Sequence, residues 1–261
     1  MKLQIYQVDA FTRRRFGGNP AAVVPLIEPL TAEQMQQIAA ENNLSETAFY
    51  RARGAEFDLR WFTPAVEVKL CGHATLATAH ILFAEKNYAG EELVFHTKSG
   101  ILRVKKTASG YEMNFPADTL QEISDIPSAL TTGLNAEIKE VWRGDTDWLV
   151  RVENRAVIEG LSPDFRLLGS LPGRGIIVTA PGDETDFVSR CFYPQAGIDE
   201  DPVTGSAHTT MTPYWAKQLG KNKLTARQIS DRVGELECEL QADRVLLRGN
   251  AVTYLRGEIE V

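Results

Sequence analysis

The second half of this chain repeats the order of segments of the first half, and this repetition restricts the fold more than any other feature of the sequence. When residues 45–64 are moved along the chain, they align without a gap with residues 175–194. The identical positions are Phe57, Arg60, Phe62 and Pro64 in the first copy, and Phe187, Arg190, Phe192 and Pro194 in the second. A repeat of this kind predicts two halves with the same topology.

Each copy of the repeat is followed by a stretch of small and apolar residues, which is typical of a helix buried on most of its faces. The alignment pairs Cys71 with Asp201, and a slip of three residues then pairs 72–74 with 205–207. We therefore expect an α+β fold of two pseudo-symmetric domains, each a mixed β-sheet wrapped around a central helix.

Turn-forming residues between 116 and 139 indicate where one domain ends and the next begins. We expect domains of residues 1–120 and 121–261, with the active site in the cleft between them, since ligand sites favour domain interfaces. Within the first domain, Thr31 and Gln34 form a capping-box pattern that predicts a helix start. Three alternating runs at 92–96, 101–105 and 111–115 predict an antiparallel meander.

The charge balance disfavours several classes of partner. The chain has 261 residues with 28 Lys and Arg against 35 Asp and Glu, a net charge of -7. This net negative charge repels phosphate backbones and anionic membrane surfaces, so we expect no nucleic-acid or membrane partner. The longest apolar stretch, 74–84, is too short to cross a membrane, and the N-terminal residues alternate polar and apolar, unlike a signal peptide. We expect a cytoplasmic protein.

The three cysteines suggest neither a disulfide framework nor a zinc site. Cys71, Cys191 and Cys238 are odd in number, far apart and without a CxxC pair. We expect free thiols and no metal. Cys191 and Cys238 fit the apolar core of strands.

Two loops place small and polar residues directly before a predicted buried helix, at 70–75 and 197–207. Helix starts present unpaired backbone N–H groups and a partial positive charge, so these loops can hold a carboxylate or a developing enolate. An ordinary capping loop has the same composition, and this alternative stays open. A third polar position, Glu46, lies between a helix end and an apolar strand start. A carboxyl at the edge of a core is a candidate proton-transfer base, although a surface glutamate fits the same pattern.

Four segments in order, 16–23, 43–49, 71–75 and 199–208, resemble the successive signatures of the PhzF family, the phenazine-biosynthesis isomerase-like proteins. The resemblance extends over nearly the whole chain and implies a fold like that of diaminopimelate epimerase. It also implies a cofactor-independent isomerase that moves a proton between carbons of a small carboxylate-bearing substrate, without metal, and that works as a homodimer.

The resemblance assigns roles to individual residues. It implies that Glu46 is the catalytic acid and base, assisted by His73, Asp201 and Ser206. Residues implied in substrate binding are Asn19, Cys71, Gly72, Ala74, Thr204 and Gly205. Each assisting residue has a structural alternative: a helix-cap histidine for His73, a turn-fixing role for Asp201 and a simple N-cap for Ser206.

Two other functions remain open. Related amino-acid epimerases use two opposed cysteines, and the repeat pairs Cys71 with Asp201, so a Cys/Asp racemase or epimerase of a small amino or hydroxy acid is one alternative. Glu46 is favoured because the second thiol is missing, and a cysteine at a helix start is often only a small buried residue. The other alternative is a protein that binds a small acid without turnover.

Overall fold

The computed structural model describes residues 1–261, and its internal contacts divide the chain into two compact units. Unit 1 comprises Met1–Asn114 together with Arg248–Val261, and unit 2 comprises Phe115–Leu247. The C-terminal segment thus belongs to unit 1, whereas the sequence pattern assigned all of 121–261 to the second half. The reason is a long-range pairing: Ala251–Glu260 forms a strand antiparallel to Lys2–Ala10.

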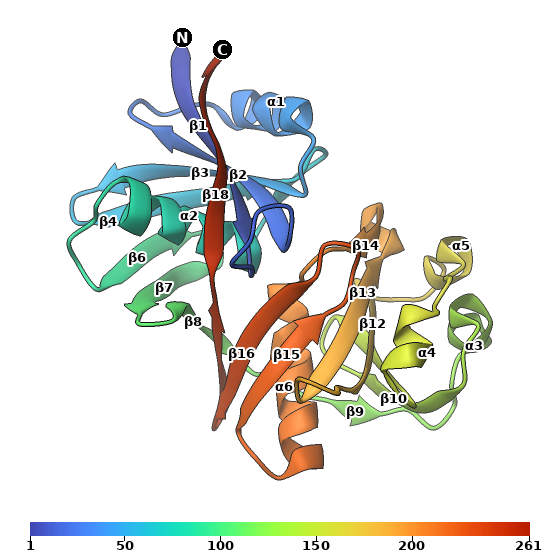
Figure 1. Cartoon of the computed structure of the whole chain (residues 1–261). Helices are drawn as coiled ribbons and strands as arrows, with labels where there is room; N and C mark the ends of the chain where they lie inside the picture. Colours follow the sequence, from blue (N-terminus) through green and yellow to red (C-terminus); the bar gives the residue numbers. More distant parts are fainter. The chain divides into compact units, whose positions relative to one another are not determined.

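Unit 1 is a mixed sheet that runs in the order β18-β1-β2-β3-β4-β6-β7-β8 (Figure 1). Its pairings are antiparallel except β2 with β3 and β4 with β6, which are parallel. The elements are β1 Lys2–Ala10, β2 Asn19–Leu26, α1 Ala32–Asn42, β3 Glu46–Arg53, β4 Glu56–Phe62, β5 Glu67–Val68, α2 Gly72–His80, the π-helix η1 Ile81–Glu85, β6 Glu92–Thr97, β7 Gly100–Thr107, β8 Gly110–Pro116 and β18 Ala251–Glu260.

The helix α2 is buried along nearly its whole length because its sequence is made of small residues. Residues 73–79 are all buried, and α2 packs against β1, β2, β3 and β18. By contrast, α1 is amphipathic and covers an apolar cluster that includes Met35, Phe49 and Phe62. The predicted capping box of α1 is confirmed: Thr31 Oγ1 accepts from Gln34 N, and Gln34 Oε1 accepts from Thr31 N.

Unit 2 contains its own mixed sheet and a second buried helix, α6, which packs against β11, β15 and β16. Residues 130–192 contribute most of its apolar core. The elements are β9 Gln121–Glu122, α3 Ser128–Leu134, β10 Ile138–Arg143, β11 Asp147–Val152, α4 Arg155–Glu159, α5 Phe165–Leu168, β12 Gly175–Pro181, β13 Phe187–Tyr193, the 3-10 helix η2 Pro194–Ala196, β14 Ile198–Asp201, α6 Gly205–Leu219, β15 Lys223–Gln228, β16 Gly234–Gln241 and β17 Arg244–Gly249.

The pairing pattern of unit 2 repeats that of unit 1 strand by strand. In unit 1, β1 pairs antiparallel with β2, β2 parallel with β3, β3 antiparallel with β4, and β4 antiparallel with β5 and parallel with β6, which pairs antiparallel with β7. The strands β10 to β16 of unit 2 pair in the same order and with the same orientations. In both series the buried helix follows the fifth strand. The fold class expected from the sequence, two similar α+β halves each built around a central helix, is therefore confirmed. None of the helices is long and apolar enough to span a membrane.

Candidate functional site

In unit 1, the first residue of β3 contacts the first turn of α2. Glu46 Oε2 lies 3.1 Å from His73 Nε2, and the exposed fractions of the two side chains are 14% and 6%. The atoms are close enough for an ion pair, but their alignment does not meet the geometry of a hydrogen bond. The parallel pairing of β2 with β3 sets this position, because it holds Glu46 in register with Ala21. A carboxylate is thus kept beside an imidazole at the edge of the core.

The other ring nitrogen of His73 has two neighbours. Asn19 Nδ2 lies 3.3 Å from His73 Nδ1, and Cys71 Sγ lies 3.6 Å from the same nitrogen. Asn19 is the first residue of β2, and Cys71 directly precedes α2. Three separate elements therefore hold the ring from both of its nitrogen atoms, which restricts its rotation.

The charges around His73 alter the pKa values of this cluster. Burial lowers the pKa of the His73 ring, whereas charge and hydrogen-bond interactions with Cys71 and Glu46 raise it, and the net direction is well above 6.5. Burial and the neighbouring Glu46 carboxylate raise the pKa of the Cys71 thiol from 9.0.

The same three side chains form a group that could hold a metal ion. One potential ligand atom from each of Glu46, Cys71 and His73 lies within 4.8 Å of the others. Oxygen, sulfur and nitrogen donors in this combination suit zinc. The spacing of the cysteines did not indicate this cluster, because Glu46 lies on β3, whereas Cys71 and His73 lie at the start of α2. All three cysteines are free and buried, as predicted.

In unit 2, a buried hydrogen-bond network surrounds the end of β14. Thr204 Oγ1 donates to Asp201 Oδ2 at 2.5 Å. Gln228 Nε2 donates to the Asp201 carbonyl at 2.7 Å, and Gln228 Oε1 accepts from Thr204 N at 2.8 Å. All three residues are more than nine-tenths buried. The network fixes the direction of the Asp201 carboxylate at the start of α6.

Ser206, the second residue of α6, contacts a pair of charged residues that the sequence analysis missed. Arg174 Nη2 donates to Ser206 Oγ at 2.9 Å, and the same guanidinium pairs with the buried Asp147. The repeat contains a signal for this pair: Asp147 begins β11 as Asn19 begins β2. Extending the alignment upstream of residue 45 pairs Asn19 with Asp147 only after a slip of two residues, because the offset of 130 pairs Asn19 with Leu149.

The predicted backbone positions all lie in the first turns of α2 and α6. Gly72 and Gly205 are the first residues of these helices, and Ala74 is fully buried in α2. Neither Cys71 nor Thr204 provides a side-chain cap, in contrast to Thr31 at α1. Both helix starts thus lack the side-chain oxygen that usually satisfies the first N–H groups.

The structure brings the predicted residues together in two sets, one in each unit. Asn19, Glu46, Cys71, Gly72, His73 and Ala74 form the set in unit 1, and Asp201, Thr204, Gly205 and Ser206 form the set in unit 2. That both sets serve one substrate stays a prediction.

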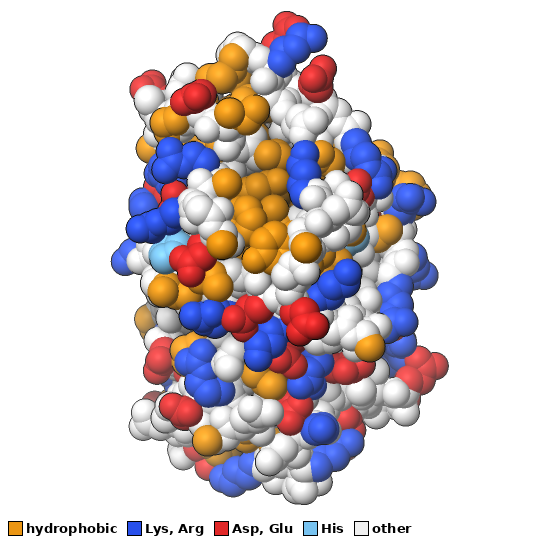
Figure 2. All heavy atoms as spheres, turned by 90° about the vertical axis from the view of Figure 1, so that its left-hand side faces the viewer, with side chains coloured by type: hydrophobic (Ala, Val, Ile, Leu, Met, Phe, Trp, Pro, Cys, Tyr) orange, Lys and Arg blue, Asp and Glu red, His pale blue; other side chains and the backbone are white.

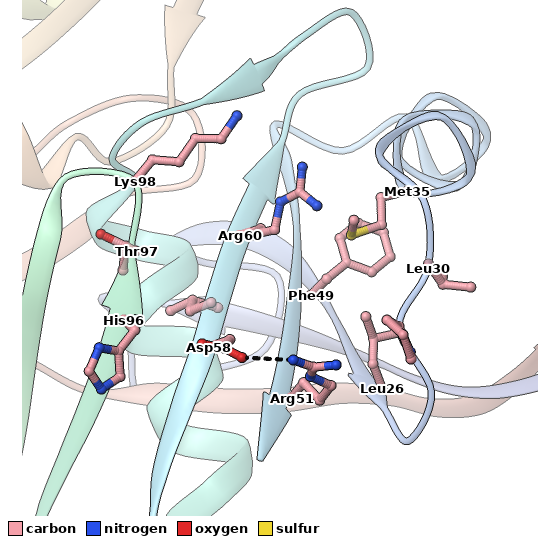
Figure 3. A pocket seen from close by; sticks show the side chains of 12 residues that line it. Leu26, Leu30, Met35, Phe49, Arg51, Asp58, Arg60, His96, Thr97 and Lys98 are labelled. Carbon is pink, nitrogen blue, oxygen red and sulfur yellow. Dashed lines mark hydrogen bonds and ion pairs between the residues drawn. The ribbon is translucent and has the colours of Figure 1, made fainter. Parts of the chain in front are cut away.

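A separate pocket lies on the other face of the unit 1 sheet. Figure 2 shows hydrophobic side chains gathered on one face of the molecule, with charged side chains around them. The pocket in Figure 3 has this composition: about 410 Å³ with an apolar floor that includes Met35 and Phe49. Its cations are paired, for example Arg51 with Asp58 at 3.1 Å. Glu46 and Phe49 lie on opposite faces of β3 because side chains alternate along a strand, so this pocket does not include Glu46.

Two repeated α+β halves, with a carboxylate and an imidazole at the start of a buried helix, define an epimerase-like protein. The chain belongs to the PhzC-PhzF family, described as phenazine biosynthesis-like protein, whose model matches residues 8–257. An uncharacterised isomerase of Pseudomonas aeruginosa is 48% identical over 261 residues and covers 100% of both chains.

Solved structures agree with this assignment. A PhzF-family phenazine biosynthesis protein of Enterococcus faecalis has a TM-score of 0.97 and 44% identity, with 100% of both chains covered. A hydroxyproline epimerase of Agrobacterium vitis shares the fold, with a TM-score of 0.61, 11% identity, and coverage of 99% of this chain and 92% of that chain. The chain is therefore an enzyme of the isomerase class with an epimerase-like fold.

Proposed function

We propose that this isomerase moves a proton between carbon atoms of a small carboxylate-bearing substrate, with Glu46 as the acid and base and with neither metal nor coenzyme. The observation that carries the proposal is the contact of 3.1 Å between Glu46 Oε2 and His73 Nε2. The Glu46 side chain in this contact is partly accessible and lies beside the first turn of the buried helix α2. The family membership supports the same residue as the base.

The reaction requires one carboxylate to act twice. Glu46 removes a proton from an acidic carbon, and the electron pair delocalises into the conjugated substrate. The resulting carboxylic acid then returns the proton to another carbon on the same face, so the carboxylate is regenerated and the electrons balance. A base of this kind contributes about 10²- to 10⁴-fold in rate.

His73 supports this chemistry through its charge. When its ring is protonated, His73 stabilises negative charge that develops on the substrate beside Glu46. Asp201 and Ser206 enter the proposal through the family resemblance, which assigns them to the same reaction as assisting groups.

Deuterium exchange at carbon tests the proposal directly. Candidate small carboxylic acids are incubated in heavy water with the wild type and with Glu46→Gln, which keeps the shape of the side chain but cannot accept a proton. We expect exchange or product formation with the wild type and a loss of about 10²-fold or more in the variant. The control is Glu56→Gln, which removes a carboxylate of β4 that pairs with His96 and should leave turnover unchanged. Equal turnover by Glu46→Gln and wild type would exclude Glu46 as the base.

Two further measurements separate the alternatives. Exhaustive dialysis against a chelator should leave turnover unchanged, and a loss that returns with zinc would show that Glu46, Cys71 and His73 hold a catalytic metal. Cys71→Ala should retain turnover. If it abolishes turnover while Glu46→Gln does not, the enzyme is a Cys/Asp racemase or epimerase.

The assembly and location of the enzyme are part of the same proposal. The family resemblance supports a homodimer, and the net charge of -7 fits a cytoplasmic protein without nucleic-acid partners. Sedimentation equilibrium of the full chain tests the dimer: a single species of 29.0 kDa would contradict it.

A further inference from the structure

Arg174 in unit 2 and Glu46 in unit 1 each contact the buried helix of their own unit, although the repeat aligns Arg174 with Leu44 and not with Glu46. Glu46 is the first residue of β3, and Arg174 immediately precedes β12, the equivalent strand of the repeat. Each contacts the second residue of the buried helix of its own unit: Glu46 contacts His73, and Arg174 contacts Ser206. A negative side chain in unit 1 and a positive side chain in unit 2 therefore contact the same position of the two buried helices, from positions that the repeat does not align.

The Arg174 guanidinium is fixed by buried groups on one side. Arg174 Nε donates to Asp147 Oδ1 at 3.0 Å, and Nη2 donates to the other carboxylate oxygen. The exposed fraction of the side chain is 2% for Asp147 but 41% for Arg174. The guanidinium also lies over the Tyr193 ring, 5.1 Å from its centroid. A two-point ion pair and a stacked ring set the plane of the guanidinium and leave its other edge accessible.

The accessible edge carries hydrogen-bond donors. The Nη2 atom donates to Ser206 Oγ at 2.9 Å, whereas the two N–H groups of Nη1 have no partner within the chain. Because Ser206 Oγ accepts this bond, its own O–H remains available to donate to another acceptor. Half-exposed donors from a planar guanidinium and a hydroxyl match the two oxygens of a carboxylate.

We infer that Arg174 binds the carboxylate of the substrate and directs the Ser206 hydroxyl toward the same group, with Asp147 as the residue that positions Arg174. This inference rests on the proposed function, since it assigns the part of that reaction that recognises the acid. This inference also gives the buried Asp147 carboxylate a role, because without this carboxylate the Arg174 guanidinium could rotate away from Ser206.

A structural role for the same contacts makes a different prediction. Arg174 and Asp147 join β11, β12 and α6, so they stabilise unit 2 whether or not they bind substrate. The variant Arg174→Lys separates the two roles. It keeps the positive charge beside Asp147 but lacks the planar guanidinium, whose several N–H groups can bind the Asp147 carboxylate, Ser206 and a ligand at the same time. Binding should then weaken more than folding does.

The test uses the full chain and simple anions as probes. Arginine side chains are labelled with ¹⁵N, and the Nε–Hε resonance of Arg174 is followed while acetate or malonate is added, with acetamide and malonamide as uncharged counterparts. We expect a saturable shift with the carboxylates and none with the amides. Calorimetry should show that malonate affinity falls about tenfold to a hundredfold in Arg174→Lys and about tenfold in Ser206→Ala.

The matched control is Arg190→Lys. Arg190 pairs through two nitrogens with Glu200 and lies 5.1 Å from the Phe192 centroid, but its Nη1 donates to the carbonyls of Ile158 and Leu161, so this atom is already occupied within the chain. It should retain wild-type malonate affinity. Equal affinity in Arg174→Lys and Arg190→Lys, or a wild type that binds neither acetate nor malonate, would overturn the inference. If Arg174→Lys unfolds, Ser206→Ala decides, because unchanged affinity in that variant also overturns it.

Malonate binding tests the role of Arg174, and proton exchange tests the role of Glu46, so the two proposals can fail independently. Glu46→Gln should bind malonate as the wild type does while it loses proton exchange. If Glu46→Gln still exchanges protons and Arg174→Lys has lost malonate binding, the proposed base is wrong and Arg174 remains the carboxylate-binding residue.

Discussion

Asn19 Nδ2 lies 3.3 Å from His73 Nδ1, so the first residue of β2 contacts the second residue of the buried helix α2. The contact is fully enclosed: Asn19 is 0% exposed and His73 is 5% exposed. It restrains the ring that faces Glu46 through its other nitrogen. The proposed base Glu46 comes from β3, its neighbour His73 from α2, and the Asn19 amide that contacts this ring from β2.

Asn19→Ala should release the His73 ring and lower turnover. Loss of a buried hydrogen-bonding amide costs about 1 to 3 kcal/mol of unfolding free energy, and a ring that rotates away from Glu46 lowers the rate on the order of tenfold or more. The ¹⁵N resonances of the His73 ring report the change in hydrogen bonding. An unaltered His73 spectrum in this variant would show that Asn19 does not orient the ring.

The pH dependence of stability should differ in sign between two histidines. The pKa of His73 is raised, so the folded state holds this proton more tightly than the unfolded state. The resulting stabilisation is fully present below pH 6.5 and is lost as the pH rises through the higher folded pKa. Denaturant unfolding across this range should show that the advantage of wild type over His73→Gln shrinks as the pH rises.

His208 provides the opposite case within the same chain. Burial lowers its pKa to about 4, while its Nδ1–H donates to the Thr204 carbonyl at 2.8 Å. The unfolded state therefore takes up this proton first, and stability is lost as the pH falls from 6.5 toward 4. His208→Gln should lose less stability than the wild type over that interval. The same slope in both proteins would contradict a neutral buried His208.

Cys71 should resist alkylation in the folded enzyme. Its thiol is buried, and burial together with the Glu46 carboxylate raises its pKa, so little thiolate exists at neutral pH. Mass spectrometry after iodoacetamide treatment should find Cys71 modified only after denaturation. Rapid modification of the native protein, with loss of turnover, would instead favour the Cys/Asp mechanism.

Thr204 should be important for folding through its hydroxyl. Thr204→Val removes the hydroxyl that donates to the buried Asp201 carboxylate at 2.5 Å, which should cost about 1 to 3 kcal/mol. Thr204→Ser keeps the hydroxyl and should recover most of this loss. Thr210→Val is the control, since Thr210 Oγ1 donates to the less buried Asp118 at 2.8 Å, and it should cost less. Equal stability of Thr204→Val and Thr204→Ser would contradict this account.

Local and repeated patterns predicted much of the fold. The capping pattern of Thr31 and Gln34 is confirmed at α1, and the alignment of the two halves is confirmed by their identical strand pairings. These features depend on residues that are close in sequence or duplicated as a block, so they can be read without coordinates.

The remaining features depend on contacts between distant residues. The pairing of β1 with β18 joins opposite ends of the chain, which explains why the division after residue 120 differs from the observed units. The pair of Asp147 with Arg174 likewise requires that β11 and β12 lie side by side in parallel. For the site, the resemblance named Glu46 and His73, but only the coordinates revealed that Arg174 contacts Ser206.

The pairing of β18 with β1 also has a consequence for synthesis of the enzyme on the ribosome. Unit 2 is one continuous stretch of chain, whereas unit 1 includes β18, a strand of 10 residues that is translated after all of unit 2. The two termini lie beside each other in unit 1 (Figure 1), where Val261 N donates to the Met1 carbonyl. The nascent N-terminal sheet therefore keeps an unpaired edge at β1 until β18 has been synthesised, although unit 2, Phe115–Leu247, can already fold.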